Sequence, residues 1–479
     1  MSKKNRINVL ADILAMVVSL SMIAGDSVAQ ANESDTGKTE LMAGVAVVDI
    51  TPPKGWRMSG YFRERINTGT HDPLKAKAMV LAQGDRQAAL VFCDLSKISL
   101  NVSDQARRLA SRRTGIPQSN IVIAATHTHT GPLYFDALRN HFHQRVMNQH
   151  GNDPYEPFDY SAILVKKLVE VISEARTSAK PTLLEVGKAE ETRLSFNRRF
   201  HMKDGTVRFN PGRLNPRIVR PAGPVDPHVG ILLLRDANSR RAIAALTVFA
   251  LHTATTGGTE YSADYPYYLE HELRKITDDK FVSIFGIGTC GDVNHIDVKI
   301  KTKPSARQIG TRLAETVRNA LPKLCFLDSP SLAIKSAKIA VPMQQYNSEQ
   351  VVQAAQSMDK VATRKLPFLK RVEAYKIMDL QLRKGPLLPL EVQVFRFGND
   401  LAIVTLPGEV FVELGLAIKK ASPFKNTLVI ELANDAPGYI PTQKAFAEGS
   451  YETVNSRIRS GGGEMMVETA VRLLKELAE

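Results

Sequence analysis

IVIAATHTHTGP, residues 121–132, joins a short apolar run to a polar turn that ends at Gly131-Pro132. Apolar runs bounded by turn residues predict buried strands. Because side chains alternate along a strand, we expect His127 and His129 to project from the same face. Neighbouring imidazoles favour their neutral forms, which bind metals such as zinc. The pair is also compatible with a structural, hydrogen-bonded duo, but its place at a strand end favours a metal site.

Apolar runs of the same kind recur along the chain and predict an α/β fold. The predicted strands are 45–50, 78–83, 88–93, 121–126, 229–234, 243–250, 281–287, 391–396, 401–406 and 427–432. Amphipathic stretches predict helices at 102–113, 160–176, 265–276, 305–319, 409–420 and 463–478. The spacing is too uneven for an eight-fold barrel. Two segments, 137–157 and 197–227, are predicted to be long loops of the kind that often form lids or binding sites.

The first thirty residues have the composition of an export signal. Lys3, Lys4 and Arg6 precede a mostly apolar run, and Ala29-Gln30-Ala31 offers a small-residue cleavage site. An amphipathic first helix is the alternative. We expect residues 1–31 to be a signal peptide and the protein to be secreted or periplasmic.

Composition limits the class of partner. The 479 residues carry a net charge of +14 and three cysteines, too few for a disulfide framework in an exported chain of this size. The charge favours anionic partners. The basic residues are scattered along the sequence without interleaved aromatics, so we expect no nucleic acid partner and at most peripheral membrane contact. The sequence leaves the oligomeric state open.

Further metal ligands should come from other strand ends. The sequence after His129 lacks the Asp-His of the metallo-β-lactamases, and the pair follows too many strands for a barrel amidohydrolase. His252 ends an apolar run, although a lone histidine there could equally be a hydrogen-bonded core residue. Glu409 is predicted in the first turn of a helix, where it could simply complement the helix dipole. Tyr439 lies in a turn-rich stretch after a strand.

These segments, in this order, resemble the catalytic domain of the neutral, non-lysosomal ceramidases, zinc enzymes that cleave the amide of ceramide. The resemblance includes the blocks AGVAVVDITPP (43–53), GTHDPL (69–74), FNRR (196–199), VDPHVGILLL (225–234), CGDVNH (290–295) and EGSYET (448–453). It implies one large mixed α/β domain over residues 40–479. We expect the resemblance to be limited to this domain, without the C-terminal immunoglobulin-like domain that ceramidases possess.

The resemblance also implies roles for single residues. His127, His252, Glu409 and Tyr439 match the zinc ligands, and His129 becomes a catalytic neighbour of the metal. Arg198 matches an arginine that lines the substrate pocket. Glu413, one helical turn after Glu409, is a rival ligand that the family pattern disfavours.

One departure bears on the reaction. The family's Gly-Asp-Val-Ser-Pro-Asn run reads GDVNHI here, so Asn294 replaces the serine. An asparagine can donate a hydrogen bond to an oxyanion but cannot form an acyl-enzyme. His295 is predicted either to act as an acid at the site or to be a surface residue.

The expected function is therefore that of a zinc hydrolase which uses zinc-activated water on an N-acyl bond, with ceramide or another small-molecule or lipid substrate. Two alternatives remain: a hydrolase of the same fold acting on an ester, an N-acyl amino sugar or a glycan fragment, and a zinc-bearing binding protein without catalysis.

Overall fold

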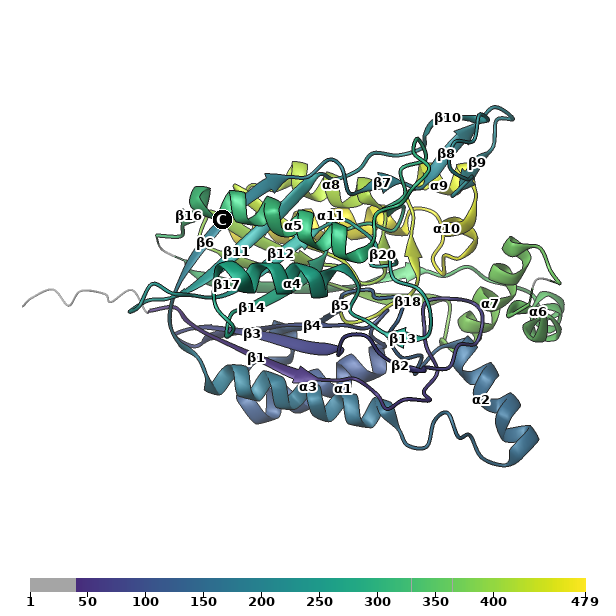
Figure 1. Ribbon diagram of the computed structural model, residues 1–479, viewed down its shortest axis with the longest axis horizontal. Helices are drawn as coiled ribbons and strands as arrows, with labels where there is room; N and C mark the ends of the chain where they lie inside the picture. The colour runs from purple at the N-terminus through teal and green to yellow at the C-terminus, as the bar shows by residue number, and fades with distance from the viewer. Residues whose placement is uncertain (1–39, 329, 364) are drawn as a thin grey trace, which may run out of the picture. The chain divides into compact units, whose positions relative to one another are not determined.

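Two β-sheets lie face to face in the computed structural model, which describes residues 40–328, 330–363 and 365–479 (Figure 1). The larger sheet has nine strands, eight of them in the order β14-β12-β11-β6-β1-β3-β4-β5, with β16 paired to β6. The smaller has the order β17-β18-β19-β21. The predicted signal peptide, residues 1–31, lies outside the described residues.

The strands of the larger sheet are β1 (Met42–Asp49), β3 (Lys75–Gln83), β4 (Arg86–Cys93), β5 (Ile121–Ala125), β6 (Lys180–Glu190), β11 (His228–Asp236), β12 (Ala242–Phe249), β14 (Val282–Ile287) and β16 (Cys325–Phe326). Those of the smaller are β17 (Leu332–Pro342), β18 (Leu387–Phe397), β19 (Leu401–Thr405) and β21 (Asn426–Ile430). All five residues of β5 and of β19 are buried. Strands covered on both faces read as continuous apolar runs, which is why these two show no alternation.

Helices cover the outer faces of both sheets. The larger sheet packs against α1 (Leu100–Thr114), α3 (Tyr160–Thr177), α4 (Tyr265–Ile276) and α5 (Ala306–Ala320), and the smaller against α8 (Val412–Ala421) and α11 (Gly462–Ala478). One apolar cluster fills each helix–sheet layer, and a third, which includes Phe92, Leu232 and Phe395, fills the space between the sheets. The described residues thus form one compact unit of four layers, helix, sheet, sheet and helix.

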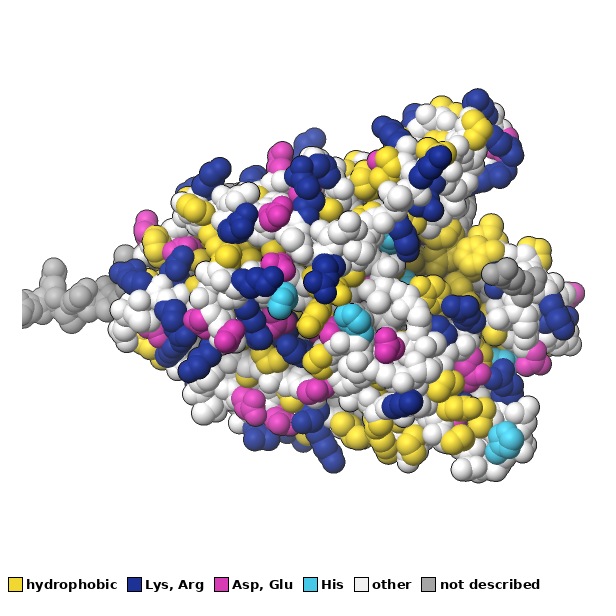
Figure 2. All heavy atoms as spheres, in the orientation of Figure 1, with side chains coloured by type: hydrophobic (Ala, Val, Ile, Leu, Met, Phe, Trp, Pro, Cys, Tyr) yellow, Lys and Arg dark blue, Asp and Glu magenta, His cyan; other side chains and the backbone are white. Residues whose placement is uncertain are grey.

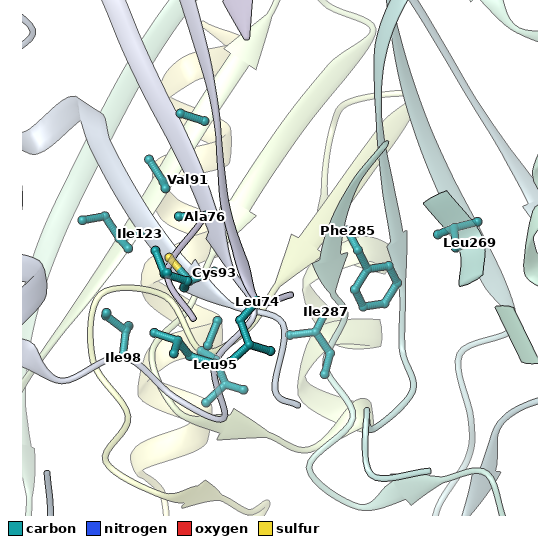
Figure 3. Close-up of a cluster of buried hydrophobic side chains, with 14 of the residues drawn as sticks. Leu74, Ala76, Val91, Cys93, Leu95, Ile98, Ile123, Leu269, Phe285 and Ile287 are labelled. Carbon is teal, nitrogen blue, oxygen red and sulfur yellow. The ribbon is translucent and has the colours of Figure 1, made fainter. Parts of the chain in front are cut away.

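The core beneath the larger sheet is close to the strand ends that carry the site. Figure 3 shows Val91 and Cys93 of β4, Ile123 of β5, and Phe285 and Ile287 of β14 within this cluster. All five side chains are almost completely buried. Such close packing fixes the ends of these strands, because displaced core side chains would leave voids.

The remaining elements lie at the end of the sheets where the site is found. They are β2 (Gly69–Thr70), α2 (Ala137–His150), β7 (Phe196–Asn197), β8 (Arg199–Met202), β9 (Val207–Phe209), β10 (Ile218–Pro221), β13 (Glu260–Tyr261), β15 (Val293–Asn294), α6 (Ser348–Val361), α7 (Phe368–Gln381), β20 (Glu409–Val410), β22 (Tyr439–Ile440), α9 (Gln443–Glu448) and α10 (Tyr451–Val454). Two short connectors, η1 (Gln118–Asn120) and η2 (Leu321–Lys323), lie elsewhere. No helix among the described residues combines the length and the apolar character needed to cross a bilayer.

The predicted strands and helices are all present, whereas both predicted long loops are wrong. The segment 137–157 contains the helix α2, whose start is capped by Asp136. The segment 197–227 contains β8, β9 and β10, which pair as a small antiparallel sheet. Polar composition misled the prediction, because the buried apolar residues of α2, among them Leu138 and Phe142, are few and stand between polar ones.

Candidate metal centre

The candidate site gathers at the carboxyl ends of parallel strands. The pairs β4–β5, β12–β14 and β19–β21 are each parallel. His127 follows β5, His252 follows β12 and Glu409 follows β19. The segment 431–435 joins the two sheets at this end, because Ala125 N donates to Leu432 O at 3.2 Å and Glu431 N donates to Ile287 O at 3.0 Å. Residues far apart in the sequence therefore meet here.

His127 does not continue the strand. The strand β5 ends at Ala125, and His127 has a φ of 72°. The expectation that His127 and His129 project from one strand face is wrong, since alternation stops where the strand does. Their rings are nevertheless neighbours, with centroids 4.9 Å apart. A positive φ in a non-glycine residue costs on the order of 1 kcal/mol and is often found at functional sites.

Three histidines and one carboxylate converge. Ligand nitrogens of His127, His129 and His252 all lie within 4.8 Å of one another. The Oε2 atom of Glu409 is 3.4 Å from Nε2 of His127 and 3.4 Å from Nε2 of His252. Among the described residues, no group forms a hydrogen bond with Nε2 of His127, Nε2 of His129 or Oε2 of Glu409, although all three atoms are buried.

Such orphaned polar atoms are expensive unless something binds them. An imidazole nitrogen and a carboxylate oxygen are suitable ligands for a divalent transition metal. The donor set therefore fits a metal ion held between these side chains.

Carbonyl groups behind two of the histidines fix their tautomers. His127 donates from Nδ1 to Ser96 O at 2.7 Å, and His252 donates from Nδ1 to Cys290 O at 2.9 Å. In each ring, Nε2 is left with the lone pair and faces Glu409. Metal-binding histidines are usually oriented by such outer hydrogen bonds. Neither carbonyl could have been identified from the sequence.

Glu409 and Tyr439 are held side by side by the backbone. They are direct partners in the parallel pair β20–β22. The prediction that Glu409 lies in a helical turn is wrong, because α8 starts only at Val412. Glu413 lies in α8 and is absent from the pocket that Glu409 and Tyr439 line. This ladder places a phenol oxygen and a carboxylate on neighbouring strands.

Burial and mutual charge set the protonation states of the cluster. Burial, followed by the neighbouring histidines, lowers the pKa of His129 well below its ordinary value. Burial and the charge of Arg198 lower the pKa of His252 to about 3. Burial would raise the pKa of Glu409, but His127 and His252 hold it well below the usual range. Burial raises the pKa of Tyr439 well above its ordinary value. At neutral pH His129 and His252 are thus uncharged and Glu409 is ionised, the states in which such groups bind a metal.

Arg198 lies directly against the cluster. Its Nη1 donates to Nε2 of His252 at 3.1 Å, its Nε to Glu452 at 2.9 Å and its Nη2 to Gly291 O at 2.6 Å. Its guanidinium also lies 5.4 Å from the ring centre of Tyr439. A metal bound to His252 would replace the first of these hydrogen bonds, and Glu452 and Gly291 would still hold the guanidinium.

Asn294 and His295 are placed differently from one another. Asn294 is buried in β15, where Nδ2 donates to Asn210 Oδ1 at 3.0 Å. Asn210 in turn is bonded through its backbone to Arg198. His295 lines a separate cavity with Phe196 and residues around the start of α5, and burial lowers its pKa to about 4. The structure therefore does not bring His295 into the pocket of the metal cluster.

The cluster opens into a pocket that the sequence only partly indicates. His127, His129, Glu409 and Tyr439 line it together with two kinds of side chain that were not predicted. The apolar and aromatic ones are Tyr61, Phe62, Leu133, Leu138, Tyr375, Ala436 and Tyr451, and the charged ones are Lys97, Asp136 and Arg457. Signals for these residues were weak, because aromatic and basic residues in irregular segments have no spacing that marks a pocket.

The sequence matches the model of one protein family, neutral/alkaline non-lysosomal ceramidase, N-terminal, over residues 41–319. The chain belongs to this family. It is 27% identical over 275 residues to the neutral ceramidase of Pseudomonas aeruginosa and 23% identical over 305 residues to neutral ceramidase B of Dictyostelium discoideum. These alignments cover 53% and 60% of this chain but only 38% and 40% of the relatives.

Two solved ceramidase structures share the fold. The structure of the Pseudomonas aeruginosa enzyme superposes with a TM-score of 0.69, covering 92% of this chain and 75% of that one at 20% identity. A ceramidase complexed with C2 gives a TM-score of 0.67 at 18% identity, with the same coverage. The predicted mixed α/β fold and the predicted membership of the ceramidase family are both confirmed. The roles assigned to individual site residues stay predictions.

Proposed function

We propose that this ceramidase-family protein is a zinc-dependent hydrolase that cleaves an N-acyl amide bond with water. The observation that carries the proposal is the convergence of His127, His252 and Glu409 on one buried point, with orphaned atoms on His127 and Glu409. Its relatives are neutral ceramidases, so a ceramide-like substrate is the leading candidate.

Four residues would hold the metal: His127, His252, Glu409 and Tyr439. Two imidazoles, one carboxylate and one phenol oxygen suit zinc, and a water molecule would take a fifth coordination position. When bound, zinc lowers the pKa of a water molecule towards about 7 and polarises the carbonyl group to be attacked. The Ser96 and Cys290 carbonyls keep both imidazoles turned towards this point.

His129 and Arg198 would act on the substrate. The free Nε2 of His129 lies beside His127, where a neutral imidazole can accept a proton from the attacking water or donate to the carbonyl oxygen. The guanidinium of Arg198, fixed by Glu452, presents positive charge where the oxyanion develops. Asn294 cannot form an acyl-enzyme, so water attacks the carbonyl directly and the products are a carboxylate and an amine.

Aromatic rings at the pocket support an acyl group as part of the substrate. Phe62 and Tyr375 have ring centres 5.4 Å apart, Phe62 and Phe368 6.1 Å, and Phe368 and Tyr451 5.3 Å. Phe62, Tyr375 and Tyr451 line the same pocket as Glu409. Apolar linings with few polar groups are typical of sites that bind the hydrocarbon part of a ligand.

A different acylated substrate is the second candidate, and the charged groups of the pocket favour it. Lys97 pairs with Asp136 at 2.6 Å and Arg457 with Asp379 at 2.9 Å, and both cations line the pocket. Because each cation already has a carboxylate partner, these pairs suit a polar group beside the acyl chain, as in an N-acyl amino sugar, an ester or a glycan fragment. The replacement of the family's serine by Asn294 points in the same direction.

Metal analysis followed by a substrate screen tests the proposal. The purified protein should contain about one zinc and hydrolyse acyl amides faster than the matching esters. His127→Ala should lose both zinc and activity. Stoichiometric zinc without turnover of any acyl substrate would favour a binding protein, and absence of stoichiometric metal would overturn the proposal. We also propose export, for which the amino-terminal sequence of the mature protein should begin near residue 32.

A further inference from the structure

Two segments that are separate in sequence form one basic surface at the end of the molecule that carries the pocket. The first, residues 199–221, contains the small sheet of β8, β9 and β10. The second, residues 296–304, precedes α5. Leu214 N donates to Val298 O at 2.7 Å and joins them. We call these two segments together the cationic lobe. Figure 1 shows the sheet projecting from the helices and strands around it.

The cationic lobe carries many exposed basic residues and few acidic ones. Its exposed cations are Lys203, Arg208, Arg213, Arg217, Arg220, Lys299, Lys301 and Lys303, and its acidic residues are Asp204 and Asp297. Asp204 pairs with Arg208 at 2.6 Å and with Arg217 at 2.8 Å. Within the described residues, no carboxylate pairs with the other six cations. Figure 2 shows several basic side chains on the projecting part of the molecule, which Figure 1 labels β8 to β10.

Exposed aliphatic side chains lie among the cations. Leu214 is 51% exposed, Val219 59% and Ile300 46%. Leu214 has a φ of 53°, a conformation that an exposed leucine does not adopt by preference, and its backbone hydrogen bond to Val298 holds it there. Aliphatic groups beside unpaired cations are typical of surfaces that enter the headgroup region of an anionic bilayer. A soluble polyanion would be recognised by the charges alone.

The lobe adjoins the proposed active site. Phe209 of β9 lies with its ring centre 4.6 Å from that of Tyr451, which lines the pocket with His127 and Glu409. Arg198, against the metal cluster, directly precedes β8. A surface bound by the lobe would therefore lie close to the pocket entrance, which Figure 2 shows as a recess with apolar walls beneath the lobe.

We propose that the cationic lobe docks the protein on anionic lipid surfaces, with Leu214, Val219 and Ile300 inserted among the headgroups and the surrounding cations against the lipid phosphates. The inference rests on the proposed function in one respect: the contact would give the enzyme access to an acyl substrate held in a lipid layer. Docking itself needs neither bound metal nor turnover, so the two proposals can fail separately.

Vesicle binding by the full-length protein tests the inference. The protein should co-sediment with vesicles of phosphatidylcholine that contain about 30% phosphatidylglycerol and bind far more weakly to phosphatidylcholine alone. Raising the salt from about 50 mM to about 500 mM should weaken binding, because exposed charges are screened. The variant Glu409→Gln should bind vesicles like the wild type, even where it is inactive.

Matched variants separate charge from insertion. Arg213→Glu with Lys301→Glu should weaken binding to anionic vesicles on the order of 20-fold or more, because each basic residue at such a surface contributes about fivefold. Arg112→Glu with Lys166→Glu makes the same charge change on α1 and α3 and should have little effect. Leu214→Asn with Val219→Thr, which suit a positive φ and a strand respectively, should weaken binding about tenfold while all cations remain.

Three results would overturn the inference. The first is equal binding to neutral and anionic vesicles. The second is an equal loss in the α1–α3 control and the lobe variant. The third is absence of vesicle binding combined with salt-sensitive binding to heparin that the aliphatic substitutions leave unchanged, since the partner would then be a soluble polyanion. Hydrolysis of a short-chain, water-soluble substrate should be unchanged in the lobe variants, which shows that they fold.

Discussion

Replacing Glu409 by glutamine should lower the stability of the protein when metal is present and change it little when metal is absent. The carboxylate is buried, and its Oε2 lies 3.4 Å from Nε2 of His127 and of His252 but forms no hydrogen bond with a described residue. Without metal, His127 and His252 stabilise this carboxylate, as its lowered pKa indicates, whereas the glutamine amide of the same shape can donate to an imidazole nitrogen in its place, so the free energy of unfolding should change little. With metal, it removes a negatively charged ligand and should lower that free energy.

The size of the effect follows from linkage. A metal present at about 100 times its Kd stabilises the folded state by about 2.7 kcal/mol. Loss of an outer hydrogen-bonding partner weakens metal binding by about 10- to 100-fold, and loss of a direct ligand should cost at least the upper value. At the same metal concentration, Glu409→Gln would then retain only about 0.4 kcal/mol of stabilisation. The expected difference between variant and wild type is therefore about 2 kcal/mol, present only when metal is added.

Urea unfolding of chelator-stripped protein, with and without buffered zinc, measures both free energies. Glu413→Gln is the matched control, because it makes the same chemical change at the rival carboxylate four residues on in α8. The reasoning is refuted if zinc stabilises Glu409→Gln as much as the wild type, or if Glu413→Gln loses the zinc effect instead. A stripped Glu409→Gln protein that is several kcal/mol less stable than stripped wild type would show that the carboxylate is mainly structural.

Other predictions address stability, the serine position and the backbone of the site. Burial lowers the pKa of Lys376 from 10.5 to about 8, so between these values the unfolded chain binds a proton that the native state lacks and stability rises with pH. Lys376→Met should therefore raise the free energy of unfolding by up to about 3 kcal/mol at pH 7 and by less at pH 10, as urea titrations at both pH values can check. Asn294→Ser should keep or improve hydrolysis while costing about 1 kcal/mol through its lost amide hydrogen bond, and an inactive but folded variant would contradict direct attack by water. In Gly60→Ala, with φ at 98°, the new Cβ would lie 2.5 Å from His129 O, so the melting temperature should fall further than in Gly205→Ala, which has a φ of 78° and open space around it.

Most of the fold could be read from the sequence because its strands are buried on both sides. The runs at 121–125 and 401–405 lie between layers, and continuous apolar stretches of this kind are hard to confuse with exposed loops. The helix α2 and the sheet of β8 to β10 escaped prediction because their sequences are mostly polar, although Leu138 and Phe142 of α2 are buried. A cap at Asp136 and backbone pairing also stabilise these elements, and hydrophobic periodicity gives no signal for either.

The residues of the candidate site could likewise be predicted only in part. His127 and His252 could be found because they directly follow apolar strands, and Tyr439 only through its place among the blocks that resemble ceramidases. The partners that orient them could not be found. The Ser96 and Cys290 carbonyls act through the backbone, where residue identity carries no information. Glu452 has side-chain bonds to Arg198 and Arg199 that depend on how a distant short helix packs.

The two-residue ladder between β20 and β22 bears on how a metal would enter and leave. The separation of the Glu409 and Tyr439 main chains is set by amide hydrogen bonds, including Glu409 N to Gly438 O at 2.9 Å and Phe411 N to Ile440 O at 3.1 Å. Because the backbone holds these two residues in place, the site is formed before a metal binds. Calorimetry of metal uptake should consequently show only a small heat-capacity change, because little apolar surface is buried when an ion enters a cage that is already built. Exchange of one divalent ion for another would then proceed in the folded protein, at a rate governed by ligand release alone.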